Sequence, residues 1–186
     1  MSFSINYISN LTPANNNIVI SVSNLSQLKS IELPSKIQLN IDNREFVNKF
    51  TTDKYINLFN YELKSNLLVN IKIICITPED KNSLKFGSAL YDELFKLQQK
   101  EFTFILSKKL HESCKKVFAD IIFGFSIKSY NFLKYKSKKS QYLNISLLNI
   151  YNFRNSKLID YNSNLLFAIN YTKDLISEPA NVLNPL

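Results

Sequence analysis

The sequence predicts an α/β domain built on a mixed sheet with helices on both of its faces. The strongest strand, Leu67–Ile76, is nearly continuous in branched apolar residues, which is typical of a strand covered on both sides. Segments with helical apolar spacing follow it and alternate with short apolar runs, which is the order of elements in α/β folds. A chain of 186 residues, 45% of them hydrophobic, is long and apolar enough for one domain with a real core.

The N-terminal third is predicted from shorter patterns. Phe3, Ile5 and Tyr7 alternate with polar residues, which indicates a strand with one buried face. A second strand is expected at 18–22, and 55–63 is expected to be a strand or part of a hairpin. Short helices are expected near 25–28, where Pro34 ends the pattern, and at 42–50.

The remaining two thirds show longer elements. Thr77–Asp80 ends the strongest strand, and a helix is expected over 83–99, with Phe86, Leu90, Leu94 and Leu97 on one stripe. A buried strand at 102–106 precedes a helix over 107–129, a basic loop at 134–140 and a strand within 142–151. The helix over 107–129 places these residues on one face: Leu110, Cys114, Val117, Phe118, Ile121, Ile122 and Phe125. A third long helix is expected over 161–177, with Leu165, Leu166, Ile169 and Leu175 inward.

The net charge of +8 rests almost entirely on lysine. Arg44 and Arg154 are the only arginines, and arginine is the preferred residue for two-point contacts with phosphate and guanine. The residue types in which the chain is rich (Asn, Lys, Ile, Phe, Tyr and Ser) largely have A/T-rich codons. A genome with biased base composition is therefore our preferred explanation of the many lysines. The cluster Lys134–Lys139, with aromatic residues beside it, has the composition that binds single-stranded nucleic acid by charge and stacking. We favour a solvated loop there, and a basic nucleic-acid-binding module without catalysis is the alternative function.

The residues that could do chemistry do not form a recognisable cluster. His111 is the only histidine and is interpreted as a surface residue near the start of a helix. A zinc site normally needs three or four clustered ligands, whereas Cys75 and Cys114 are well separated and are expected to be buried free thiols. Asp92 and Glu93 are neighbours on a helix, point about 100° apart and are expected on a solvated face. We therefore predict no catalytic, cofactor-binding or metal-binding residue in this chain.

A glycine loop for phosphate is also missing from the sequence. The chain has two glycines, Gly87 and Gly124, and both fall inside predicted helices. A P-loop or dinucleotide turn needs glycine where the backbone closes on phosphate. The strongest strand is followed instead by Thr77–Asp80, whose acidic pair would repel phosphate. A macro-type nucleotide-binding role is therefore disfavoured.

Two segments carry a more specific signal, one from Phe118 to Lys139 and one from Ala168 to Pro185. The first contains Gly124, Tyr130, Phe132, Tyr135, Lys136 and Ser137, and the second contains Asp174, Leu175, Glu178, Pro179, Asn181 and Pro185. In this spacing and order they resemble the leucyl (cytosol) aminopeptidase family. That family has a helix with Glu-Gly/Leu-Gly-x-Tyr-x-Phe-x-x-Tyr-Lys, then Arg-Asp-Leu-x-Asn-Glu-Pro-x-Asn-x-x-Thr-Pro.

The resemblance implies a macro-like N-terminal domain over residues 1–160, a mixed sheet flanked by helices. It implies that residues 161–186 form an interdomain helix and the start of a catalytic domain that the chain lacks. In the family that domain holds two divalent metals, zinc or manganese, which activate water and polarise the peptide carbonyl, and the enzymes are homo-hexamers. Its metal-ligand motifs do not occur here. The resemblance therefore implies a non-catalytic domain that is inactive alone, with the missing catalytic domain as its partner.

The chain departs from the family at several positions, which indicates a divergent member. Cys75–Pro78 stands where the family commonly has a Gly-Leu-Gly turn, and Lys173, Ser177 and Asn184 replace Arg, Asn and Thr. No apolar run approaches the roughly 20 residues that span a bilayer. The segment Met1–Asn10 does not have the pattern of a signal peptide. We therefore expect a cytoplasmic protein without a membrane partner.

Overall fold

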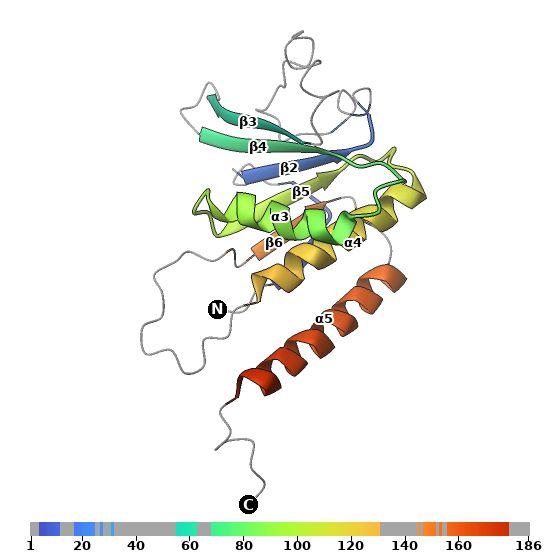
Figure 1. Cartoon of the computed structure of the whole chain (residues 1–186). Helices are drawn as coiled ribbons and strands as arrows, with labels where there is room; N and C mark the ends of the chain where they lie inside the picture. Colours follow the sequence, from blue (N-terminus) through green and yellow to red (C-terminus); the bar gives the residue numbers. More distant parts are fainter. Residues whose placement is uncertain are drawn as a thin grey trace, which may run out of the picture.

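The computed structural model describes residues 4–11, 17–24, 27, 31, 55–62, 68–130, 145, 147–151, 153 and 156–178. Within them the chain forms one six-stranded sheet in the order β1-β6-β5-β2-β4-β3 (Figure 1). The strands are β1 (Ser4–Ile8), β2 (Asn17–Val22), β3 (Tyr55–Glu62), β4 (Leu68–Cys75), β5 (Glu101–Leu106) and β6 (Leu147–Tyr151). The long helices are α3 (Ser83–Phe95), α4 (Glu112–Ser129) and α5 (Ser156–Ser177). All neighbouring strands pair in parallel except β3, which is antiparallel to β4, so the predicted mixed α/β sheet is confirmed.

The strand β2 lies inside the sheet, between β5 and β4. Ile18 of β2 is in register with Thr103 of β5 and with Ile71 of β4. Alternate side chains of a strand face opposite sides of the sheet. Every residue from Ile18 to Val22 is at most 1% exposed. Both faces of the sheet are therefore covered at β2. Ile73 and Ile74, which are 1% and 0% exposed, show the same for β4, where the branched apolar run predicted it.

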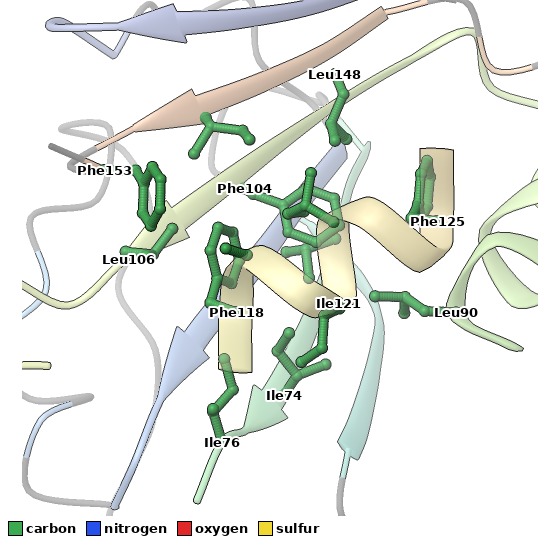
Figure 2. Close-up of a cluster of buried hydrophobic side chains, with 14 of the residues drawn as sticks. Ile74, Ile76, Leu90, Phe104, Leu106, Phe118, Ile121, Phe125, Leu148 and Phe153 are labelled. Carbon is green, nitrogen blue, oxygen red and sulfur yellow. The ribbon is translucent and has the colours of Figure 1, made fainter. Parts of the chain in front are cut away.

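The main core lies between the sheet and the helices α3 and α4 (Figure 2). The ring of Phe104 on β5 lies 6.1 Å from that of Phe118 and 6.0 Å from that of Phe125, both on α4. Leu90 of α3 and Ile121 of α4 join the same cluster and are 3% and 2% exposed. The apolar stripes predicted for these helices are therefore the faces that form the core.

The ends of the helices differ from the predicted ones for local reasons. The helix expected from 107 begins at Glu112, because the Leu110 amide donates to the Ser107 carbonyl at 3.1 Å in a turn and His111 then adopts extended backbone. The helix expected to reach 99 ends at Phe95, and Gln98 follows with a left-handed φ of 57°. The expected helices near 25–28 (apart from residue 27) and at 42–50, and the basic loop at 134–140, lie outside the described residues.

The helix α5 packs on α4 with one side only, and this corrects a prediction. The Asn162 amide donates to the Ala119 carbonyl of α4 at 3.4 Å, and Leu166 lines a small cavity together with Ala119 and Ile122 of α4. The expectation that Leu165 and Leu175 point inward is wrong, because they are 36% and 41% exposed. Leu166 and Ile169 are only partly exposed and occupy the inner side, and a neighbouring position on a helix points about 100° away. None of the described helices has the length and apolarity needed to cross a membrane.

Candidate functional site

The two glycines of the chain lie at one crossing of α3 and α4. A Cβ on Gly87 would lie 2.0 Å from the carbonyl oxygen of Ile121, and a Cβ on Gly124 would lie 2.1 Å from that of Leu84. The hydroxyl of Ser88 completes the crossing, within 3.2 Å of the Gly124 carbonyl and 3.3 Å of the Leu84 carbonyl. The prediction that both glycines lie in helices is confirmed. Their role in the described structure is to let two helix backbones touch.

The two segments that carry the family resemblance meet where α4 ends. Tyr130 directly follows α4, and its hydroxyl donates to the Asp174 carboxylate of α5 at 2.6 Å. The ammonium of Lys173 lies 4.8 Å from the centre of the Tyr130 ring and donates to the carbonyl of Ile127 at 3.1 Å. Tyr130, Lys173 and Asp174 are called the α4–α5 junction below. It joins residues that are 44 positions apart in the chain.

The charges of the α4–α5 junction suit the end of a helix. An ammonium beside the last carbonyls of α4 is favoured by the helix dipole, and its position over an aromatic face adds a cation–π attraction. Partial removal from water, and then the hydrogen bond to Asp174, raise the pKa of the Tyr130 phenol above 10.0. The phenol therefore stays protonated and remains the donor at neutral pH. The arrangement fastens α5 to α4.

Five of the residues that match the family pattern lie in the described part of the chain: Gly124, Tyr130, Asp174, Leu175 and Glu178. Gly124 serves the helix crossing, and Tyr130 and Asp174 form the junction. The backbone amide of Glu178 donates to the Leu175 carbonyl at 3.3 Å just after α5. The other matching residues lie outside the described residues: Phe132, Tyr135, Lys136, Ser137, Pro179, Asn181 and Pro185.

The polar residues considered as candidate site residues serve local structure. His111 is exposed and caps α4, because its Nδ1 accepts from the Ser113 amide at 3.3 Å. Asp92 lies 3.2 Å from the ammonium of Lys128, whereas Glu93 lies 2.8 Å from that of Lys96. The two carboxylates therefore bind different lysines and do not converge on one point, as the helical spacing predicted.

An ion pair between the sheet and α3 was missed by the sequence analysis. Lys72 of β4 lies 3.6 Å from Glu93, and its side chain is only 8% exposed. Burial lowers the pKa of Lys72, and the attraction of Glu93 opposes that effect. The hydrogen bond from Lys96 is the main cause that lowers the pKa of Glu93, and Lys72 adds to it. The signal that could have revealed the pair is a single lysine in the middle of a strand of branched apolar residues.

The cysteines are both free, as predicted, but they differ in burial. Cys114 is buried in the core, and burial raises the pKa of its thiol. Cys75 is only partly buried, which is less than expected. Across the described ranges, no group of three or more His, Cys, Asp and Glu side chains could hold a metal ion. That part of the chain therefore offers no donor set for the metals that the family resemblance implies.

A cavity of about 220 Å³ lies where β4 ends and α3 begins, lined by Cys75, Asp80, Asn82, Ser83, Lys85, Phe86, Ala89 and Ile121. It is smaller than the roughly 300–1,000 Å³ of typical ligand sites. The hydroxyl of Ser83 donates to Asp120 at 3.5 Å, a long contact. Burial raises the pKa of Asp120, opposed by Lys116. His111 does not line the cavity, so the described residues give Ser83 no imidazole base.

Comparison with solved structures places this fold within larger enzymes. Similar folds, with an α/β arrangement on a mixed and mostly parallel sheet, form part of longer chains. A mutant of tomato leucine aminopeptidase has a TM-score of 0.57 and 12% identity, over 99% of this chain and 40% of that chain. The bottromycin maturation enzyme BotP in complex with Mn has a TM-score of 0.53 and 11% identity, over 91% of this chain and 34% of that chain.

The comparisons establish a relationship at the level of the fold. The chain spans less than half of the length of either structure. No family model matches the chain, and no curated protein matches it. The chain is therefore similar in fold to part of a leucine aminopeptidase, which agrees with the resemblance that the two sequence segments carry.

Proposed function

We propose that the chain is the non-catalytic N-terminal domain of a divergent leucyl aminopeptidase. One observation supports the proposal most strongly. The two segments with the family spacing are far apart in the sequence, yet Tyr130 of one bonds Asp174 of the other at 2.6 Å. They do so in a fold that a leucine aminopeptidase shares over 99% of this chain.

The parent enzyme would remove N-terminal amino acids from peptides by hydrolysis at two divalent metals, zinc or manganese. The metals would belong to a catalytic domain beyond the shared region, because the described residues hold no set of metal ligands. The enzyme BotP is itself solved in complex with Mn, and this chain spans only 34% of it. The 186-residue domain would serve assembly, as a homo-hexamer, and would shape access to the catalytic site.

Assay of the pure 186-residue protein tests the non-catalytic part of the proposal. We expect no release of nitroaniline from leucine p-nitroanilide with added manganese or zinc, because the described residues contain no group of three or more side chains that could hold either metal. A known aminopeptidase assayed in the same buffers serves as the positive control. Turnover that persists through repeated purification would refute the proposal.

The genomic sequence immediately downstream of the codon for Leu186 tests the remaining part. We expect an open reading frame that encodes the family's Asn-Thr-Asp-Ala-Glu-Gly-Arg metal-ligand motif. A frame that closes at once, with no such motif nearby, would contradict a two-domain parent while leaving the fold unchanged.

A further inference from the structure

The outer face of α5 carries apolar and small side chains at the spacing of a coiled coil. Tyr161, Leu165, Ala168, Thr172 and Leu175 follow one another at alternating intervals of four and three residues. All five are exposed, including Tyr161 at 64%, Leu165 at 36% and Leu175 at 41%. These five residues are called the outer stripe. The spacing places them along one line of the helix, about 100° around it from the residues that face α4.

Exposed apolar side chains are concentrated on this helix. Of the eight large apolar residues that are exposed in the described chain, six lie on α5. Phe167, Tyr171 and Ile176 flank the outer stripe at 74%, 57% and 78% exposure. A helix that is apolar on both its inner and outer sides is normally covered on both. Figure 1 shows α5 alongside α4 on the side away from the sheet, so its outer side forms a boundary of the described structure.

The charges at the two ends of α5 are arranged for an antiparallel partner. Lys157 lies in the first turn, one helical turn before Tyr161, and no acidic residue lies in that turn. Glu178 directly follows the helix, whose last turn has no basic residue. Each charge has the unfavourable sign for the dipole of its own helix. In an antiparallel pair, each would lie beside the opposite charge and the favourable end of the other helix.

We propose that the outer stripe binds a second copy of this chain, with the two α5 helices antiparallel. The five positions are arranged nearly symmetrically about Ala168, so Ala168 would face its counterpart and Tyr161 would face Leu175 of the second copy. A small residue at the centre lets the two helices approach closely. The inference does not depend on the proposed function, since it uses only the outer face of α5.

The pairing is expected to be weak and to depend on concentration. From Tyr161 to Leu175 the stripe is about 21 Å long at 1.5 Å per residue, which is short for an independent coiled coil. Each helix is already folded against α4, so association does not bear the cost of forming it. We therefore expect a monomer–dimer equilibrium in the micromolar range.

Sedimentation velocity over a wide range of protein concentration tests the pairing. Leu165→Lys and Leu175→Lys should each weaken association at least tenfold, because both place a charge in the stripe. Leu84→Lys is the matched control, since Leu84 is 48% exposed on α3 and the substitution adds the same charge. Circular dichroism confirms that all variants fold. A chain that stays monomeric at every concentration would overturn the proposal, and so would equal effects of Leu165→Lys and Leu84→Lys on association. The outer stripe would then be a binding surface for a different polypeptide.

Cross-linking with a short bismaleimide tests the direction of the helices in a Cys75→Ser background. Ala168→Cys should cross-link to itself. Tyr161→Cys should cross-link to Leu175→Cys when the two variants are mixed, and neither should cross-link to itself. Efficient self-cross-linking of Tyr161→Cys would indicate parallel helices and would refute the antiparallel arrangement.

Discussion

Replacement of Gly124 by alanine should destabilise the protein, although alanine is the better helix former. Within an exposed helix the change would stabilise by about 1 kcal/mol, because glycine has more backbone freedom to lose on folding. In this structure the new Cβ would lie 2.1 Å from the Leu84 carbonyl oxygen and 2.9 Å from the Leu84 Cα. Both atoms belong to backbone, so no side chain can move aside to make room.

The size of the loss follows from the packing at the crossing. Ordinary contact requires α3 and α4 to separate by roughly 1 Å, and a gap of 0.5–1 Å forfeits about a quarter to a half of each dispersion contact. A buried side chain such as Leu90 makes about 40–60 such contacts of about 0.1–0.2 kcal/mol each. Loss of a quarter of this dispersion energy at both Leu90 and its neighbour Ile121 amounts to about 3 kcal/mol in total. After the gain in helix propensity, the net loss is about 2 kcal/mol, or about 4–8 °C in Tm.

Urea unfolding followed by circular dichroism measures this difference. Ala89→Gly, at an exposed position of α3, is the control for propensity alone and should lose about 1 kcal/mol. Gly87→Ala should behave like Gly124→Ala, and the double variant should lose less than the sum, since one separation of the helices relieves both clashes. If Gly124→Ala is as stable as the parent protein or more stable, the reasoning about the crossing is wrong.

Two further predictions concern charge. Glu93→Gln removes a charged partner of the buried Lys72 ammonium and should cost about 1 kcal/mol at neutral pH after allowance for screening. Asp92→Asn should change stability by less than about 0.5 kcal/mol, because the lysine that pairs with Asp92 is half exposed. The pKa of Glu93 in the folded protein lies below 4.5, so its contribution to stability is present above that pH and is lost as the pH falls through the lowered pKa. The stabilities of Glu93→Gln and of the parent protein should therefore converge in acid. A constant difference down to pH 2 would contradict this. In a gel-shift assay at about 50 mM salt, we expect the protein not to shift single-stranded DNA. A shift that weakens steeply as salt is added would favour the alternative function, a nucleic-acid-binding module.

Much of the fold could be predicted because burial imposes a period on the sequence. The branched apolar runs at Ile18–Val22 and Leu68–Cys75 became strands of the sheet, and the stripes that include Leu90 and Phe118 became core faces. The face of α5 could not be predicted in this way. Leu165 and Leu166 are equally apolar, so the helix has no single apolar side, and contact with α4 decides which of the two is covered.

The contacts between distant segments were beyond sequence reasoning for a different reason. Placing Gly87 and Gly124 in helices was correct, but no local pattern says that the two positions face each other across a crossing. The ion pair of Lys72 with Glu93 was also not predictable, because it depends on how α3 lies over β4. Periodicity predicts which face of an element is buried. It does not predict which residues of other elements that face contacts, because this depends on how the elements pack.

The resemblance to the aminopeptidase family has a structural explanation that does not involve catalysis. Gly124 lets α4 pack against α3, and Tyr130 and Asp174 hold α5 against α4, so three of the five described matching residues join three successive helices. Lys173, which replaces the arginine of the family, still supplies a cation to the ring of Tyr130 and to a carbonyl of α4. These roles depend on helix geometry and not on a metal or a substrate. A domain can therefore retain this part of the pattern without carrying any catalytic group, which is the property that the proposed function requires.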